Sequence, residues 1–291
     1  MAHMKEDLMP HRCLLAVMLL LMSFAASAAG PGAVRKQVEA SMRVTGVIEV
    51  EEDGSVGKFE IDNVDKLPIG VVEFVRNNVS EWAFTPMLVD GKPTGVRNKV
   101  SMRLVAKKME DGQYIIRMQA ASFDPFEVEE GSELSSKIMT PPRYPKDAAK
   151  SGVSGTVYLA LKVGRDGRVE ESMAEQVNLT FIASENEMAR WREHLSRNAV
   201  AAAKGWSFQP PVTGSGADYP YWIVRVPVAY LLEEQRSSYG KWRAYVPGPR
   251  QRWPWPNIAG SETSPEALAD GSVHQLGKDG LRLLTPLGGE S

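Results

Sequence analysis

Few residues of this sequence have the types and spacing that enzyme chemistry requires. The side chains best suited to bind a metal or to act as nucleophiles are one cysteine and four histidines: Cys13, His3, His11, His194 and His274. They are too scattered to form the ligand cluster of a zinc, haem or iron–sulfur site. No nucleophile elbow, phosphate-binding loop or dinucleotide fingerprint occurs in the sequence. The residue types therefore predict a protein without a metal or cofactor.

Paired carboxylates are the remaining candidates for catalysis, because two such groups can act as general acid and general base. Adjacent glutamates that could form such a pair include Glu170–Glu171 and Glu129–Glu130. Neighbouring side chains on a strand point to opposite faces, which separates the first pair. The second pair lies in an acidic segment with little periodicity. Neither pair predicts an acid–base couple, so we expect the protein not to be an enzyme.

The charge balance argues against a nucleic-acid partner. The 291 residues include 34 Lys and Arg against 36 Asp and Glu, which gives a net charge of −2 at pH 7. A chain with this balance has no overall positive field to attract a phosphate backbone. Hydrophobic residues make up 43% of the chain, enough apolar material for one large or two modest cores.

The first 28 residues have the pattern of a secretory signal peptide. Arg12 precedes an apolar run from Cys13 to Ala26, and Ala26-Ser27-Ala28 is a small-x-small cleavage site. The run of about 14 residues is shorter than the roughly 20 that anchor a helix in a bilayer. We therefore expect cleavage after Ala28 and export, with a retained membrane anchor as the alternative.

One pattern occurs twice in the rest of the chain. Trp82-Ala83-Phe84-Thr85-Pro86 and Trp206-Ser207-Phe208-Gln209-Pro210 share the form W-x-F-x-P, and each follows a stretch of helical character. Upstream of each lies an Asp-Gly pair between apolar runs, Asp53-Gly54 and Asp166-Gly167, which is a strong hairpin signal. Repetition of this kind predicts two copies of one small domain in tandem.

Hydrophobic periodicity predicts strands and helices in each copy. In the first copy we expect strands at 44–50, 56–61, 100–105 and 114–120 and a helix at 67–81. In the second we expect strands at 156–163, from 169 onward and at 221–231, a short helix that begins at Pro145 and a longer helix at 185–204.

These elements divide the exported chain into two domains, a linker and a tail. The domains are residues 29–123 and 141–234, joined by an acidic linker at 124–140. The tail at 235–291 is rich in Trp and Pro and then of low complexity. Exposed tryptophans are unfavourable in isolation, so we expect Trp253 and Trp255 to pack on the domain or on a partner.

The second copy resembles the TonB C-terminal domain family over roughly residues 140–232. The resemblance rests on residues that are specific in combination: Tyr144, Pro145, Gly152, Gly155, Asp166, Gly167, Trp206, Phe208 and Pro210. The first copy is similar to a degenerate version of the same domain. The resemblance implies an α+β fold class with tandem small domains, each an antiparallel three-stranded sheet packed with one or two helices.

In that family the domain is a periplasmic interaction module. It couples inner-membrane energy to outer-membrane transporters, and a short peptide of the transporter adds to its sheet as a strand. Here the apolar segment looks cleavable and no proline-rich spacer precedes the domain. We therefore expect a non-catalytic periplasmic protein that binds a protein or peptide partner, such as a TonB-dependent outer-membrane receptor, as an accessory to transport.

Two alternatives to this accessory role stay open. One is a module that associates with peptidoglycan or the cell envelope. The other is a short-reach energy transducer on the periplasmic side of the inner membrane, which requires that the N-terminal segment is retained.

The resemblance places the last strand of the second copy at the sheet margin, as a candidate partner-binding edge. Its residues are Tyr221, Ile223, Arg225 and Pro227. Pro227 fits an edge because it lacks a hydrogen-bond donor, and for the same reason it can protect the edge from pairing. Pairing between the two sheets of one chain, or between the chains of a homodimer, would also occupy this edge.

Overall fold

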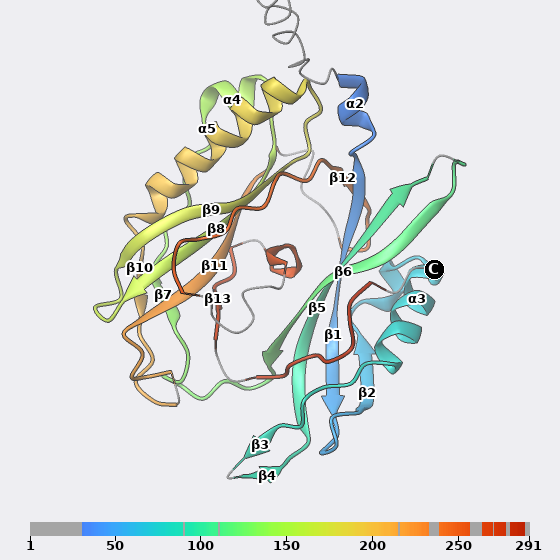
Figure 1. Cartoon of the computed structure of the whole chain (residues 1–291), viewed down its shortest axis with the longest axis vertical. Helices are drawn as coiled ribbons and strands as arrows, with labels where there is room; N and C mark the ends of the chain where they lie inside the picture. The colour runs from blue at the N-terminus through green and yellow to red at the C-terminus, as the bar shows by residue number, and fades with distance from the viewer. Residues whose placement is uncertain are drawn as a thin grey trace, which may run out of the picture.

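The computed structural model describes residues 31–89, 91–109, 111–214, 216–232, 239–256, 264–269, 271–277 and 280–288 (Figure 1). The signal peptide expected at residues 1–28 lies outside the described residues. Within these ranges, no helix is both long and apolar enough to cross a membrane.

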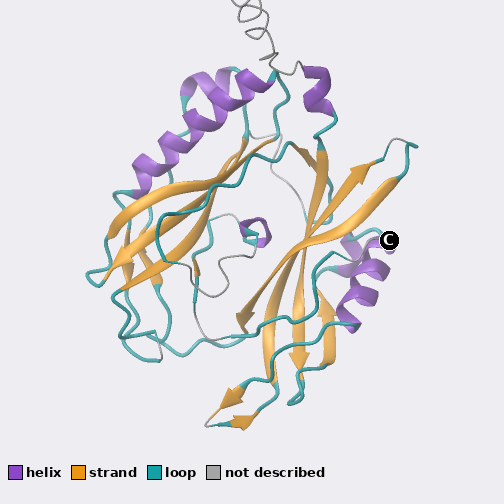
Figure 2. Ribbon diagram, viewed as in Figure 1, coloured by secondary structure: helices purple, strands orange, loops and turns teal. Residues whose placement is uncertain are grey.

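Antiparallel strands make up most of the regular structure, as Figure 2 shows. The helical elements are α2 (Pro31–Arg35), η2 (Val64–Lys66), α3 (Ile69–Ser80), α4 (Lys146–Lys150), α5 (Glu185–Ala203) and η4 (Pro265–Ala267). The strands up to the linker are β1 (Glu39–Val50), β2 (Val56–Ile61), β3 (Leu88–Val89), β4 (Lys92–Pro93), β5 (Val96–Lys108) and β6 (Tyr114–Pro125). The later strands are β7 (Ser135–Ile138), β8 (Gly155–Gly164), β9 (Val169–Leu179), β10 (Ser207–Gln209), β11 (Tyr221–Tyr230), β12 (Arg243–Tyr245) and β13 (His274–Gln275). The expected α+β fold class is confirmed.

The first domain is built around β1. This strand pairs with β2 on one side and with β5 on the other, and β6 extends the sheet beyond β5. Helix α3 covers one face because its apolar side chains recur at helical spacing, with Val71, Val75 and Val79 buried. They pack against alternate residues of β1, Val44 and Ile48.

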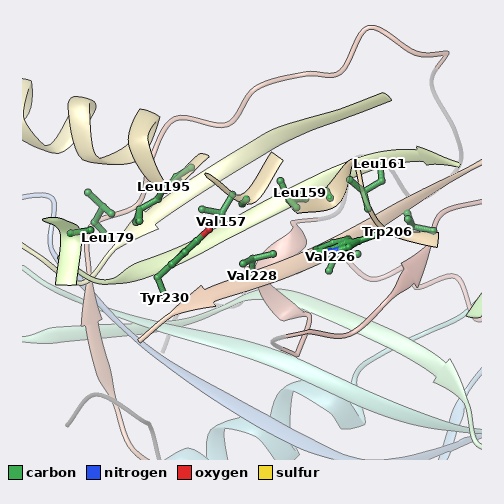
Figure 3. Packing of buried hydrophobic residues seen from close by; sticks show 14 of the residues in the cluster. Val157, Leu159, Leu161, Leu179, Leu195, Trp206, Val226, Val228 and Tyr230 are labelled. Atoms are coloured by element: carbon green, nitrogen blue, oxygen red, sulfur yellow. The ribbon is translucent and has the colours of Figure 1, made fainter. Parts of the chain in front are cut away.

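The second domain repeats this order around β8. β9 and β11 pair with its two sides, the positions that β2 and β5 occupy around β1. Ser184 caps the N-terminus of helix α5, because its hydroxyl accepts a hydrogen bond from the Glu187 N–H. The apolar side of α5, which includes Leu195, packs on the alternate residues Val157 and Leu159 of β8 (Figure 3).

The two Asp-Gly turns have the same local geometry. Gly54 and Gly167 both adopt a left-handed conformation, with φ of 86° and 77°. The carbonyl of Gly54 accepts a hydrogen bond from the N–H of Phe84 at 2.8 Å, and that of Gly167 accepts one from Phe208 at 2.7 Å. A Cβ on either glycine would lie 2.1 Å from the carbonyl oxygen of that phenylalanine. Each turn therefore requires glycine, and each holds its W-x-F-x-P run in the same way.

The tail and the linker add strands to both domains. β12 pairs with the beginning of β1, β13 pairs with β11, and Leu283 pairs with Phe84. β7, from the segment expected as linker, pairs with β10. Among the described residues the main sheets consequently have five and four strands, where the family resemblance implied three in each and the periodicity predicted four in the first copy. Two-residue strands in a low-complexity tail leave no periodic signal in a sequence.

The two sheets turn their helix-free faces toward each other. Helices α4 and α5 lie outside one sheet and α3 outside the other, with η4 between the sheets (Figure 1). η4 contacts β5, β6 and β11, and its Glu266 and Ala267 are 2% and 1% exposed. At the other end of the chain, Val34 of α2 packs into the core of the second domain. Both terminal segments thus tie the domains together.

Candidate partner-binding edge

β11 pairs with β8 along its whole length. Its valines at 224, 226 and 228 lie in the helix-covered core. The predicted edge residues therefore share the opposite face of the strand: Tyr221, Ile223, Arg225 and Pro227. Only Tyr221 is partly exposed, and the other three side chains are buried. These side chains therefore offer little exposed surface at this strand.

The tail lies along the outer margin of β11, where an open edge was expected. β13 places Gln275 opposite Val224 and His274 opposite Arg225. The buried side chain of Gln275 fixes β13 further, because its Oε1 accepts a hydrogen bond from the Leu134 N–H at 3.0 Å. β11 is therefore an interior strand at these residues, and β13 is the margin.

Two further main-chain hydrogen bonds extend this pairing. The N–H of Leu276 donates to the carbonyl of Ile223, and the N–H of Gly271 donates to the carbonyl of Pro227, both at 2.8 Å. In an antiparallel strand the N–H and the C=O of one residue point to the same side of the strand. The missing donor of Pro227 therefore faces the outer margin, so an incoming strand finds one bond fewer there.

Arg225 is engaged in a buried ion cluster rather than offered to a partner. Its Nε and Nη2 donate to the two carboxylate oxygens of Glu175 at 2.8 and 2.9 Å. Both side chains are 1% exposed. Arg250 adds a hydrogen bond to the same carboxylate at 2.7 Å, and the Trp253 ring lies 5.1 Å from the Arg225 guanidinium carbon. Burial lowers the pKa of Arg225 from its ordinary value, although Glu175 opposes that effect.

Three of the residues that carry the family resemblance, Tyr144, Pro145 and Gly152, shape the chain around α4. The Tyr144 hydroxyl donates to the Val153 carbonyl at 2.5 Å, and its ring packs edge-on against Tyr230. Pro145 is the residue before α4, and Gly152 follows that helix with a φ of 68°. The left-handed glycine lets the chain leave α4 and enter β8.

The other family residues lie along β8 and at its hairpin. A Cβ on Gly155 would lie 2.2 Å from the Asn178 carbonyl oxygen, so glycine allows the close approach of β8 and β9. Trp206 is buried and its Nε1 donates to the Thr140 carbonyl at 2.8 Å. Phe208 and Pro210 lie against the turn that Asp166 and Gly167 form. These residues position β8, which in turn holds β11.

Glu170 and Glu171 on β9 were expected to point to opposite faces of the strand, and the structure differs. Glu170 and Glu171 both lie 3.2 Å from the Lys162 Nζ. The cause is a register shift between Lys162 and Val163, which places both carboxylates on one side. A lysine between them makes the pair an ion cluster rather than an acid–base couple. The described residues contain no group of three or more His, Cys, Asp or Glu side chains that could hold a metal ion.

Sequence reasoning missed Glu175, Arg250 and the tail segment that closes β11. Glu175 is a single charged residue in a strand, which by pattern is a solvated position. Its buried neighbours come from β11 and from the tail, so no local signal identifies it.

The comparisons with known proteins point to one kind of relative. The chain is similar to "Protein TonB" from two strains of Xanthomonas campestris pv. campestris, B100 and ATCC 33913. Each relative is 36% identical over 101 residues, which is 34% of this chain and 39% of the relative. The chain thus covers well under half of these relatives' length. No family model and no solved structure matches the chain. The likeness supports a TonB-like family for about a third of the chain.

Proposed function

We propose that this chain is a non-catalytic TonB-like protein of the periplasm that binds an extended segment of a protein partner along β11. The partner would replace the chain's own residues 271–276. The observation that carries the proposal is the pairing of this tail segment with β11. A strand held by main-chain hydrogen bonds can be exchanged for a strand of different sequence, which is the basis of strand addition.

The extent of pairing favours exchange in the second domain over the first. β6 pairs with β5, the strand that corresponds to β11, from Asn98 to Lys108. β13 pairs with β11 at only two residues. Strands this short contribute little stability by themselves, so exchange at β11 costs far less than exchange at β5.

The two domains are, in this proposal, tandem copies of one TonB-like domain. The shared order of strands around β1 and β8 supports this, as do the equivalent Asp-Gly turns. The first copy is the degenerate one, and its last strand is closed by β6. It would therefore serve as a scaffold that supports the second copy.

The partner we propose is an outer-membrane receptor, on the likeness to Protein TonB. The accessory role depends on cleavage of residues 1–28, because a retained segment would make the chain a short-reach energy transducer instead. Sequencing of the native N-terminus and osmotic release decide between these two. A soluble chain that begins near Ala29 supports the accessory role, and a chain that keeps its N-terminus and stays with the inner membrane supports the transducer.

The binding proposal is tested by loosening the tail without touching β11. Gly271→Pro removes the N–H that donates to Pro227 and cannot adopt the φ of 73° at this position. We expect this variant to bind short labelled peptides of TonB-dependent receptors about tenfold more tightly than the parent, because the edge is open in a larger fraction of molecules. Fluorescence anisotropy measures the affinity.

A matched control is Gly280→Pro, because a Cβ at this tail glycine meets no atom within 4 Å. This variant should bind peptide as the parent does. If Gly271→Pro and the parent both fail to bind any receptor peptide, exchange at β11 is wrong. Retention on isolated sacculi in the same samples would then favour the peptidoglycan alternative.

A further inference from the structure

A polar cavity lies between the two domains. It has a volume of about 280 Å³ and is lined by residues of β1, β5, β8, β9 and the tail. The tail contributes Tyr239, Gly240, Lys241, Arg243, Tyr245 and Leu268. Because both sheets and the tail form its walls, a molecule bound here would contact both domains at once.

The polarity of the cavity follows from strand alternation. Met42 and Val44 of β1 point into the α3-covered core, so Ser41 and Arg43 point to the helix-free side. In β5, Arg103 likewise faces away from that core. The second sheet contributes hydroxyl groups to the same space: Thr156, Tyr158 and Thr180.

The charged residues that line the cavity are all cationic. Four cationic residues line the cavity and no carboxylate does: Arg43, Arg103, Lys241 and Arg243. Among the described residues, Arg43, Arg103 and Lys241 form no ion pair within 4 Å. Arg43 and Lys241 are exposed, so they lie at the open rim.

The nearest buried carboxylates are engaged elsewhere. Glu39 accepts hydrogen bonds from Arg117 at 3.0 Å and from the Tyr245 hydroxyl at 2.8 Å. The side chain of Glu266 accepts one from the Asn178 amide. Neither carboxylate forms an ion pair within 4 Å with Arg43, Arg103 or Lys241, although the charge of Glu266 acts on Arg103 from a greater distance.

Arg103 is the best-placed anion ligand of this lining. Its guanidinium lies 4.9 Å from the centre of the Tyr245 ring and reaches the Glu266 carbonyl only at 3.5 Å. Its Nε is shielded from solvent and has no hydrogen-bond partner among the described residues. Burial lowers the pKa of Arg103, but Tyr158, Glu266 and Tyr245 more than offset this and raise it above the ordinary value. A charged guanidinium at the wall of a cavity favours an oxygen anion.

We propose that this cavity binds a small organic oxyanion, carrying carboxylate or phosphate groups, that contacts Arg43, Arg103 and Lys241 and bridges the two domains. Guanidinium groups recognise both kinds of anion through paired N–H donors. The proposal does not depend on peptide exchange at β11.

Isothermal titration calorimetry of the full chain with citrate and with pyrophosphate tests the site. We expect millimolar or tighter binding of at least one probe, and the preferred probe identifies the anion as a carboxylate or a phosphate. Arg43→Gln and Arg103→Gln should each weaken that binding about tenfold, because each removes one charge-assisted contact. Lys241→Gln, at the exposed rim, tests the site independently of any loss of stability in the Arg103 variant.

Arg197→Gln is the charge-matched control, because Arg197 lies on the outer helix α5 with its side chain 69% exposed. It should bind the probe with the parent's affinity. Absence of binding of both anions to the parent would overturn the proposal. So would an equal loss of affinity in the Arg43, Lys241 and Arg197 variants, since that result means attraction to overall charge alone.

Discussion

Neutralising Glu175 should destabilise the second domain strongly. Glu175→Gln keeps the shape of the side chain but removes the carboxylate that pairs with the Arg225 guanidinium, whose side chain is 1% exposed. Breaking a buried ion pair by removing one partner typically costs about 3–5 kcal/mol, because the other charge stays desolvated. Burial already lowers the pKa of Arg225, which indicates the same desolvation.

The geometry supports a loss of this size. Arg225 donates two hydrogen bonds to the carboxylate, at 2.8 and 2.9 Å. Charge-assisted hydrogen bonds contribute about 1.5–3 kcal/mol each, so the pair accounts for roughly 3–6 kcal/mol. Arg250 adds little, because its side chain is 36% exposed and solvent screens its interaction.

Urea unfolding followed by tryptophan fluorescence measures the loss. At an m-value of about 2 kcal/mol/M, the midpoint should fall by roughly 2 M. Glu193→Gln, which breaks an exposed pair with Arg197 on α5, should lower stability by less than about 0.5 kcal/mol. Replacing both Glu175 and Arg225 by Met should restore most of the stability. A loss below about 1 kcal/mol in Glu175→Gln would refute the description of a desolvated ion cluster.

Two further predictions concern the turns and the tail. Gly54→Ala and Gly167→Ala should each destabilise their domain by more than the roughly 1–2 kcal/mol that a left-handed alanine costs, because the added Cβ also meets a carbonyl oxygen. Gly112→Ala, whose Cβ would meet no atom within 4 Å, should cost only the roughly 1–2 kcal/mol of the left-handed conformation. Thermal unfolding compares the three, and equal losses would contradict the close approach at the two turns. The pKa of Glu171 lies below its ordinary value, chiefly because the Trp255 Nε1 donates a hydrogen bond to its carboxylate. The stability that this hydrogen bond contributes is therefore fully present above the ordinary pKa of a glutamate and is lost as the pH falls through the lowered pKa of the folded protein. Acid titration of fluorescence in the parent and in Trp255→Phe should differ in that range, and identical curves would contradict the bond.

The sequence determined the longer strands and helices of both domains. β2 has the bounds that were expected, and α5 ends one residue before its expected end. The reason is local, because alternation, helical spacing and Asp-Gly turns act over a few residues. The family resemblance is local in the same sense, since residues such as Tyr144 and Trp206 stabilise the domain that contains them.

Only the tertiary structure decided what covers the outer margin of β11. The residues that close β11 lie fifty positions further along the chain, and Gln275 carries no pattern that marks it as a strand. The cationic cavity likewise depends on two helix-free faces meeting, where Arg43 and Arg103 would be read from sequence as solvated charges. Pairing between distant segments is set by backbone hydrogen bonds and by burial, which depend little on the identity of the side chains. A sequence pattern records which face of a strand is apolar, and it does not record what lies against the other face.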